Sequence, residues 1–155
     1  MNEEAKIRPI YSSDLSSLKR VIAANELFPA QMLDEMTASY FEGKSDTELW
    51  LTYEETEPVA VAYCSPEKMT EGTWNLYLIA VHPDYQGKGC GKKIVRYLEN
   101  LLKNKSARIL LVETSSLPEF TATQQFYLKC GFEKEARVRD FYQAGEDKIV
   151  FRKAL

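Results

Sequence analysis

The sequence predicts a single domain of the α/β class over residues 1–155, built as a mixed sheet flanked by helices. A chain of 155 residues is long enough to bury one sizeable core and short for two. Its 45% hydrophobic and 28% charged residues are the balance of an ordinary globular domain. Strand patterns alternate with apolar residues at helical spacing, and the predicted order is β-α-α-β-β-β-α-β-α-β-β.

The first half of the chain contains two predicted helices and four predicted strands. Ser13 or Asp14 caps the first helix, and Pro29 is well placed to open the second, which ends near Tyr40. The apolar residues of the first helix recur three or four positions apart: Leu15, Leu18, Val21 and Ile22. The strands are expected at residues 5–10, 48–53, 59–64 and 73–81, with the second and third joined as a hairpin.

The second half contains two further helices and three further strands. A helix at 89–103 has an apolar inner stripe, and a shorter helix at 121–129 is stopped by Gly131. The unbroken apolar run from Ile109 to Val112 predicts a central strand at 108–114. The last two strands, joined across residues 143–147, are expected at 133–141 and 148–152.

Composition excludes several classes of protein. The net charge of −3 disfavours nonspecific nucleic-acid binding, which needs a basic face. Three scattered cysteines and a single histidine disfavour a zinc site or a disulfide framework, so we expect no metal. No apolar run reaches the length of a membrane span and the acidic start is no signal peptide. We therefore expect a reducing, cytoplasmic compartment and no membrane partner.

The stretch from Tyr77 to Lys93 carries the strongest functional signal. It combines an apolar strand, a proline turn, three closely spaced glycines and the start of a helix with lysines in its first turns. Glycines let backbone N–H groups converge, and a helix N-terminus adds unpaired donors and a partial positive charge. This arrangement predicts a site for a phosphate or pyrophosphate group.

Two nucleotide-binding motifs fit this loop poorly. A P-loop needs a serine or threonine after its last glycine and lysine, but here Lys93 stands in that place. A Rossmann site needs G-x-G-x-x-G, and the spacing of Gly87, Gly89 and Gly91 is one residue short. Glu113 follows at a tolerable distance, but the three strands before the motif do not suit a first βαβ unit.

A third pattern fits both the loop and the sequence around it. Residues 86–91, Q-G-K-G-C-G, match [QR]-x-x-G-x-[GA], and about 35 residues later comes F-Y-x-x-x-G-F at 126–132. Over essentially the whole chain this pairing resembles the GNAT superfamily of acyl-CoA-dependent N-acetyltransferases. The resemblance implies a mixed, mostly antiparallel sheet with a splay between two central strands.

The same resemblance implies acetyl-CoA as co-substrate, docked between the strands that end at Val81 and Thr114. The backbone of Ile79, Ala80 and Val81 would run beside the pantetheine arm. The loop would take the pyrophosphate through Gln86, Gly87, Lys88, Gly89, Cys90, Gly91 and Lys92. Glycines suit that role because a Cβ would hold the phosphate oxygens away from the N–H groups.

Acetyl transfer to an amine requires two proton movements. An amine with a pKa of about 10.4 is mostly protonated at neutral pH and must lose a proton before it attacks. The departing thiolate must then gain one, and Tyr127 occupies the family's general-acid position. The other interpretation of Tyr127 is a core aromatic residue on the short helix.

The base is assigned by position as well. About eleven residues before Gln86, where some family members carry a glutamate, this chain has Asn75, which cannot serve as a base. Other members place a glutamate on the next strand, which corresponds to Glu113. A carboxylate that ends an apolar strand is expensive to bury. Glu113 is therefore a candidate base or amine anchor, and a carboxylate bonded only to local backbone is the alternative.

Two features depart from the family or stay open. The family's cofactor-contacting asparagine falls at Phe120, and Thr121, Thr123 or a serine at 115–116 is a candidate substitute. The acceptor amine is not encoded in a readable way, although residues 25–30 and 142–147 are expected to line its site. A non-catalytic acyl-CoA-binding sensor is the alternative function. The resemblance also implies a possible homodimer, because members of the family are often dimers.

Overall fold

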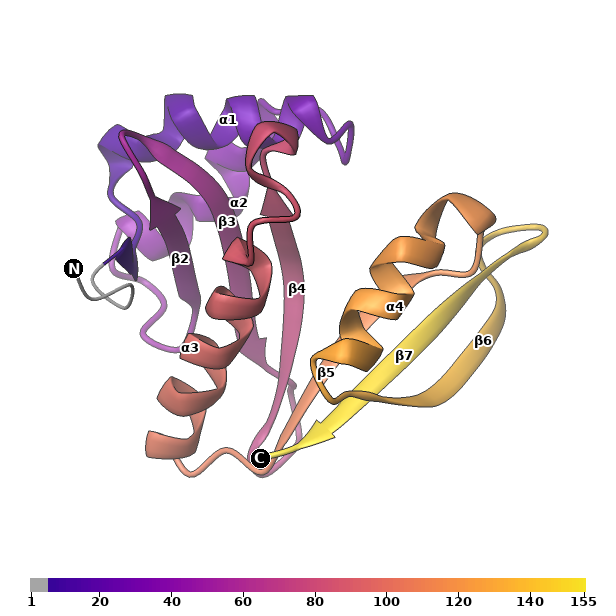
Figure 1. Cartoon of the computed structure of the whole chain (residues 1–155). Helices are drawn as coiled ribbons and strands as arrows, with labels where there is room; N and C mark the ends of the chain where they lie inside the picture. Colours follow the sequence, from indigo (N-terminus) through magenta and orange to yellow (C-terminus); the bar gives the residue numbers. More distant parts are fainter. Residues whose placement is uncertain (1–5) are drawn as a thin grey trace. The chain divides into compact units, whose positions relative to one another are not determined.

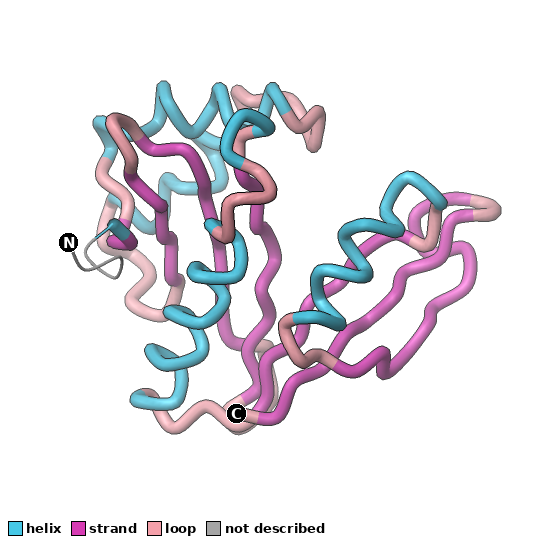
Figure 2. Tube along the Cα trace, viewed as in Figure 1, coloured by secondary structure: helices cyan, strands magenta, loops and turns pink. Residues whose placement is uncertain are grey.

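The computed structural model describes residues 6–155, which form four α-helices and seven strands (Figure 1). The helices are α1 (Leu15–Ala24), α2 (Met32–Phe41), α3 (Cys90–Asn104) and α4 (Thr121–Lys129). The strands are β1 (Ile7–Pro9), β2 (Leu49–Glu54), β3 (Pro58–Pro66), β4 (Thr73–Val81), β5 (Ile109–Ser115), β6 (Glu133–Gln143) and β7 (Glu146–Ala154). Helices and strands together make up most of the tube in Figure 2.

The seven strands form one sheet in the order β1-β2-β3-β4-β5-β7-β6. β1 with β2, β2 with β3, β5 with β7 and β6 with β7 are antiparallel, and β4 with β5 is parallel. The prediction of a mixed, mostly antiparallel sheet with flanking helices is confirmed. β5 lies between β4 and β7, so the prediction that its apolar run marks a central strand is also confirmed.

The bounds of β4 and α4 are those predicted from the sequence, and α2, β6 and β7 are among the elements that differ from expectation. α2 begins at Met32 instead of Pro29, because the residues before it form i→i+3 turns, with Met32 N–H donating to the Pro29 carbonyl at 2.9 Å. β6 and β7 are longer than predicted, and fewer residues separate them. Their turn is tight because Gly145 adopts a φ of 84°, which L residues rarely reach. Ala5, the expected start of the first strand, lies outside the described residues.

The chain divides into two compact units. The first combines Met1–Ser65 with Leu78–Leu98, and the second combines Pro66–Tyr77 with Glu99–Leu155. Both β4 and α3 pass from one unit into the other. The expectation of one domain over 1–155 stays a prediction.

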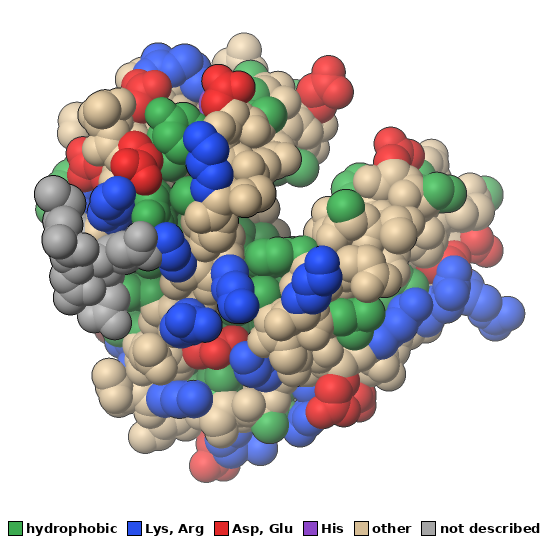
Figure 3. Space-filling view, in the orientation of Figure 1, with side chains coloured by type: hydrophobic (Ala, Val, Ile, Leu, Met, Phe, Trp, Pro, Cys, Tyr) green, Lys and Arg blue, Asp and Glu red, His purple; other side chains and the backbone are tan. Residues whose placement is uncertain are grey.

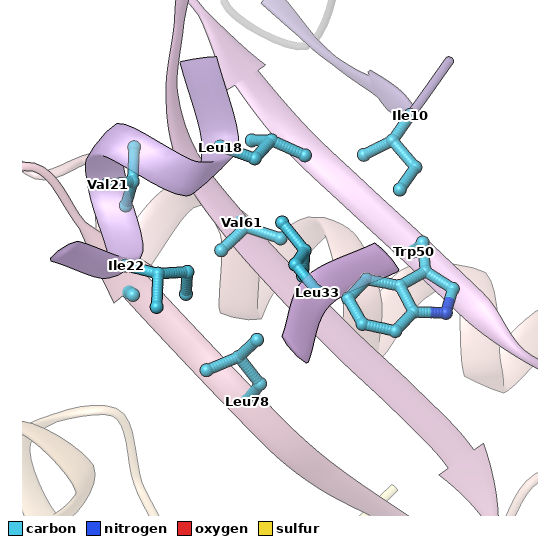
Figure 4. Packing of buried hydrophobic residues seen from close by; sticks show 9 residues of the cluster. Ile10, Leu18, Val21, Ile22, Leu33, Trp50, Val61 and Leu78 are labelled. Carbon is cyan, nitrogen blue, oxygen red and sulfur yellow. The ribbon is translucent and has the colours of Figure 1, made fainter. Parts of the chain in front are cut away.

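The first unit has a hydrophobic core between the helices α1 and α2 and the strands β2 to β4 (Figure 4). Its fully buried members include Leu18 and Ile22 of α1, Leu33 of α2 and Val61 of β3. Burying each such side chain contributes about 1.5–3 kcal/mol. Leu78 and Ala80 of β4 belong to the same cluster, so the core holds the end of the strand that leads into the glycine-rich loop.

The second unit places its apolar side chains on one face of β5. Leu110, Val112 and Thr114 are buried, whereas the alternate residues Leu111 and Glu113 are only half-buried. α4 covers the buried face, as Figure 1 shows, and the Tyr127 ring packs there. The other face of β5 is therefore the one with polar side chains available for chemistry.

Candidate active site

The end of β4 is fastened to the start of the glycine-rich loop and to α1. The Val81 carbonyl accepts hydrogen bonds from Gln86 Nε2 at 2.9 Å and from Asn25 Nδ2 at 3.0 Å. Gln86 Nε2 also donates to Asn25 Oδ1 at 3.1 Å. A carbonyl oxygen has two lone pairs, so both acceptor positions of Val81 are filled. Gln86, a predicted cofactor residue, therefore acts in this structure by holding the first residue of the loop.

The loop owes its shape to two glycines in left-handed backbone conformations. Gly87 has a φ of 76° and Gly89 a φ of 87°. Among the described residues, a Cβ built on Gly87 meets nothing within 4 Å, and one on Gly89 meets only Lys93 Cε at 3.8 Å. The space above the glycines is open, as a phosphate-binding loop requires, and the backbone conformation favours glycine independently of any ligand.

α3 begins directly behind these glycines with its N-terminal amides unpaired within the helix. Lys93 N–H donates to the Gly89 carbonyl at 3.0 Å, which makes this the first hydrogen bond of the helix. The N–H groups of Cys90, Gly91 and Lys92 precede it and have no acceptor in the helix. With the helix dipole they form a ready site for an anion. The Cys90 side chain is buried, and burial raises the pKa of its thiol, so it packs instead of reacting.

Basic side chains surround this helix start. Figure 3 shows Lys and Arg gathered over the loop and the first turns of α3, where the sequence places Lys88, Lys92, Lys93 and Arg96. Lys88, Lys92 and Arg96 are exposed, and Lys88 Nζ lies 5.2 Å from the centre of the Tyr85 ring. These charges raise the local concentration of an anionic ligand.

Tyr127, the predicted general acid, lies in the aromatic core of the second unit. It is 4% exposed, and its ring centre is 5.5 Å from that of Phe151 and 5.8 Å from that of Phe132. Burial raises the pKa of its hydroxyl well above the ordinary value, so the group stays protonated through the neutral range. Tyr127 thus has the packing of a core residue and the protonation state of a hydrogen-bond donor.

Glu113, the predicted base, is bonded to side chains, and within the described part of the chain it has no hydrogen bond to local backbone. Asn75 Nδ2 donates to Glu113 Oε1 at 3.1 Å, and Lys148 Nζ lies 3.4 Å from Oε2. The Glu113 side chain keeps 29% of its surface exposed. Tyr142 lies nearby: burial, then the charges of Glu113 and Glu146, raise the pKa of its hydroxyl. Glu113 is held in place and still reachable by a ligand.

Asn75 joins Glu113 to a second carboxylate that the sequence did not reveal. Its Nδ2 also donates to Glu67 Oε1 at 2.8 Å, and the Tyr77 hydroxyl donates to the same oxygen at 2.6 Å. Asn75 and Tyr77 are two residues apart on β4, so their shared face was predictable. Glu67 follows the end of β3 in a connecting segment, where no periodicity indicates which way a side chain points.

Asn75 has one polar atom without a partner. The residue is 1% exposed, and its Oδ1 is buried without a hydrogen bond among the described residues. Leaving a buried acceptor unpaired costs about 1–3 kcal/mol. Both amide hydrogens are committed to carboxylates, and this fixes the orientation of the amide.

Glu113 and Tyr127 lie toward opposite faces of β5. Val112 pairs with Phe151, whose ring contacts Tyr127, and Glu113 is the next residue along the strand. Successive side chains of a strand point to opposite faces. One face therefore carries Glu113 with its polar partners, and the other carries the Tyr127 ring.

The serine candidates at the end of β5 have structural partners. Ser115 Oγ donates to Glu146 Oε2 at 2.6 Å, and Ser116 Oγ accepts from Asp147 N–H at 2.8 Å. The proline turn expected after β4 is a 3₁₀ turn at Pro83–Tyr85, which His82 caps by accepting a hydrogen bond from Asp84 N–H at Nδ1, at 3.1 Å. Thr121 and Thr123 lie in α4, and no side-chain hydrogen bond within residues 6–155 assigns them a role.

Residues 6–155 contain neither a membrane-spanning helix nor a cluster of metal ligands. No helix in this part of the chain combines the length and apolar character needed to cross a membrane. No three histidine, cysteine or acidic side chains of these residues come together as a metal site would require.

Comparison with known proteins identifies relatives of the whole fold. The sequence profile described as "Acetyltransferase (GNAT) domain" matches residues 45–134. A solved Desulfovibrio desulfuricans structure, described as an acetyltransferase of the GNAT family, is 29% identical, with a TM-score of 0.87 and coverage of 96% of this chain and 97% of that one. A search of curated protein sequences finds no significant match.

More distant structures share the fold alone. The Escherichia coli ribosomal-protein-S18-alanine N-acetyltransferase is 20% identical, with a TM-score of 0.75 over 96% of this chain and 92% of that one. An aminoglycoside 6'-N-acetyltransferase solved with coenzyme A is 14% identical, with a TM-score of 0.77 over 96% of both chains.

Proposed function

The chain belongs to the GNAT family of acetyltransferases, and on that premise we propose that it transfers an acetyl group from acetyl-CoA to a primary amine. The amine nitrogen attacks the thioester carbonyl carbon, the carbon–sulfur bond breaks, and the products are an N-acetyl amide and CoA. No acyl-enzyme is needed. High pKa values for the Cys64 and Cys90 thiols, each raised mainly by burial, support direct attack over a cysteine nucleophile.

The observation that carries the proposal is the glycine-rich loop at the start of α3. Gly87 and Gly89 leave open space above the loop, and the first helix amides lack an acceptor within the helix. This arrangement would hold the pyrophosphate of the cofactor. Glu113 and Tyr127, on the two faces of β5, are assigned the two proton movements separately.

In this proposal Glu113 takes a proton from the acceptor amine, directly or through water. Deprotonating an amine of pKa about 10.4 at pH 7.4 costs roughly 4 kcal/mol, so a positioned acceptor of the proton matters. Lys148 Nζ lies 3.4 Å from Glu113 Oε2 and holds that oxygen on one side. Asn75 holds the carboxylate in one orientation.

Tyr127 would donate its hydroxyl proton to the departing thiolate. Burial raises the pKa of this hydroxyl and makes it a weak acid in its apolar surroundings. Apolar surroundings also raise the pKa of a thiol, so a thiolate that forms beside Tyr127 is a strong base there. A fixed donor next to developing negative charge stabilises the transition state before the proton moves.

An acceptor screen tests the proposed function. Purified protein is mixed with acetyl-CoA and a panel of small amines, amino acids and peptides, and release of free CoA thiol is followed. We expect release that depends on at least one acceptor, with the acetylated amine confirmed by mass spectrometry. Binding of CoA with no turnover on any acceptor would instead favour a non-catalytic acyl-CoA sensor.

We place the activity in a reducing, cytoplasmic compartment. Among the described residues no disulfide joins Cys64 or Cys90, and this supports the placement, because oxidising compartments favour disulfides. A homodimer stays a prediction from the family.

A further inference from the structure

The polar face of β5 carries more negative charge than the proposed proton transfer needs. Glu113 has Lys148 as a counter-charge at 3.4 Å. Glu67 accepts hydrogen bonds from Tyr77 and Asn75, which lower the pKa of its carboxyl and keep it ionised. The charge of Lys148 also lowers the pKa of the Glu67 carboxyl, so one lysine is the counter-charge for both carboxylates. The pair therefore keeps one net negative charge.

Glu146, the other carboxylate near this face, is already engaged. It accepts the Ser115 hydroxyl at 2.6 Å and the Gln143 side-chain amide at 2.9 Å. Its bonds close the β6–β7 turn against the end of β5. The net negative charge therefore lies on the pair of Glu67 and Glu113.

The buried amide of Asn75 indicates that the two carboxylates are held together for a purpose. Its Nδ2 bonds both Glu67 and Glu113 while its Oδ1 stays buried and unpaired. An apolar side chain at this position would pack without that unpaired acceptor. Local arrangements that lower stability are concentrated at functional sites. The amide sets the spacing of the carboxylates, since two oxygens bonded to one nitrogen must lie close together.

We propose that the acceptor amine carries a second positive charge close to its reacting nitrogen, and that Glu67 binds this second charge while Glu113 receives the reacting amine. The inference rests on the proposed function for the role of Glu113. Because both carboxylates share Asn75 Nδ2 at 2.8 and 3.1 Å, the two nitrogens of the acceptor are separated by a short chain. A small aliphatic diamine has this chemistry.

Neighbouring aromatic side chains suit such a ligand. Tyr77 is 50% exposed beside Glu67, and Phe141 and Tyr142 of β6 are also among the exposed large hydrophobic residues. Lys148 Nζ already lies 4.0 Å from the centre of the Phe141 ring, so a cation over an aromatic ring occurs in this cluster. The methylene groups of a diamine would gain contact with these surfaces.

Calorimetry with the full chain saturated with CoA tests the inference without relying on turnover. The probes are 1,3-diaminopropane and its monoamine counterpart, propylamine. We expect the diamine to bind at least about tenfold more tightly, as a charged hydrogen-bonding contact provides. Glu67→Gln keeps the shape and removes the charge, so it should abolish the diamine's advantage and leave propylamine binding within about twofold. Equal binding of both amines to the unmodified protein would overturn the inference.

Glu71→Gln is the matched control, since it removes the same charge from an exposed residue in the same β3–β4 connection. This variant should keep the preference for the diamine. If both variants lose that preference equally, the effect comes from the overall charge of the protein, and a specific role for Glu67 is contradicted. Thiol release with the same two amines gives the second measurement. Preferential binding of the diamine without any turnover would support the two-carboxylate site and reject the proposed acetyl transfer. Turnover without a preference for the diamine would support the proposed acetyl transfer and reject the two-carboxylate site.

Discussion

At the scale of single residues, Tyr127 shows how packing and chemistry combine in one side chain. Its ring fills the aromatic core between α4 and β7, and its hydroxyl stays protonated because burial disfavours the phenolate. The structural and the chemical interpretation of this residue are therefore compatible. A substitution that keeps the ring and removes the hydroxyl separates them.

Tyr127→Phe should lower kcat by roughly 10²-fold or more, the usual contribution of a positioned proton donor. Because the ring is kept, we expect CoA affinity and the melting temperature to change little. Steady-state kinetics with the acceptor found in the screen, together with CoA titration, measure both effects. Tyr97→Phe removes a hydroxyl from α3 and should leave kcat unchanged. Turnover unaffected by the Tyr127 substitution would remove this hydroxyl from the mechanism.

At the scale of elements, the glycine-rich loop is shaped by the strand before it and the helix after it. The core of the first unit holds the end of β4, and Gln86 and Asn25 fasten the Val81 carbonyl. α3 then begins at Cys90 with free amides in its first turn. The loop between these fixed ends can reach its conformation only with glycine at the left-handed positions.

Gly87→Ala tests the loop against a control that carries the same backbone strain. The φ of Gly87 is 76° and that of Gly145 is 84°, and a Cβ on either meets nothing within 4 Å among the described residues. Each substitution should lower the free energy of unfolding by about 1–2 kcal/mol. Only Gly87→Ala should also weaken CoA binding, by about tenfold or more, because its Cβ displaces a phosphate oxygen from a loop amide. Equal CoA affinity in the two variants would contradict a pyrophosphate at this loop.

At the scale of the whole molecule, a single parallel strand pair interrupts an otherwise antiparallel sheet. β4 and β5 pair from Thr73 with Ile109 to Leu76 with Val112, and β4 then runs on to Val81. This continuation carries the chain from the second compact unit into the first. A cofactor that binds only the folded chain would therefore raise the free energy of unfolding of the whole protein.

Acetyl-CoA at about 100 times its dissociation constant should stabilise the protein by about 2.7 kcal/mol. For a chain of this size that corresponds to a rise of roughly 5–10 °C in melting temperature, measured by differential scanning fluorimetry. Pantetheine lacks the pyrophosphate and should give a much smaller rise at the same concentration. No rise with acetyl-CoA at saturating concentration would argue against a cofactor site in the native fold.

Local chemistry explains what could be predicted from the sequence. The bounds of β4 and α4 follow from an apolar strand pattern and from Gly131, which ends α4 with a φ of 92°. The glycines, glutamine and helix start of the phosphate loop lie within a few residues of one another, so their spacing alone indicates an anion site. The end of α2 was predicted to within one residue, while its start was not, because the turns after Pro29 depend on packing.

By itself, the sequence determined the class of fold, the glycine-rich loop and the positions of Tyr127 and Glu113. Only the tertiary structure decided the environment of Glu113. Asn75 and Glu113 are 38 residues apart in the chain and meet because β4 and β5 are neighbours, and Lys148 joins them from β7. Glu67 enters this cluster from a segment without periodicity. Sequence patterns describe which face of an element is apolar, but contacts between distant polar side chains depend on strand order and register, which arise only when the chain is folded.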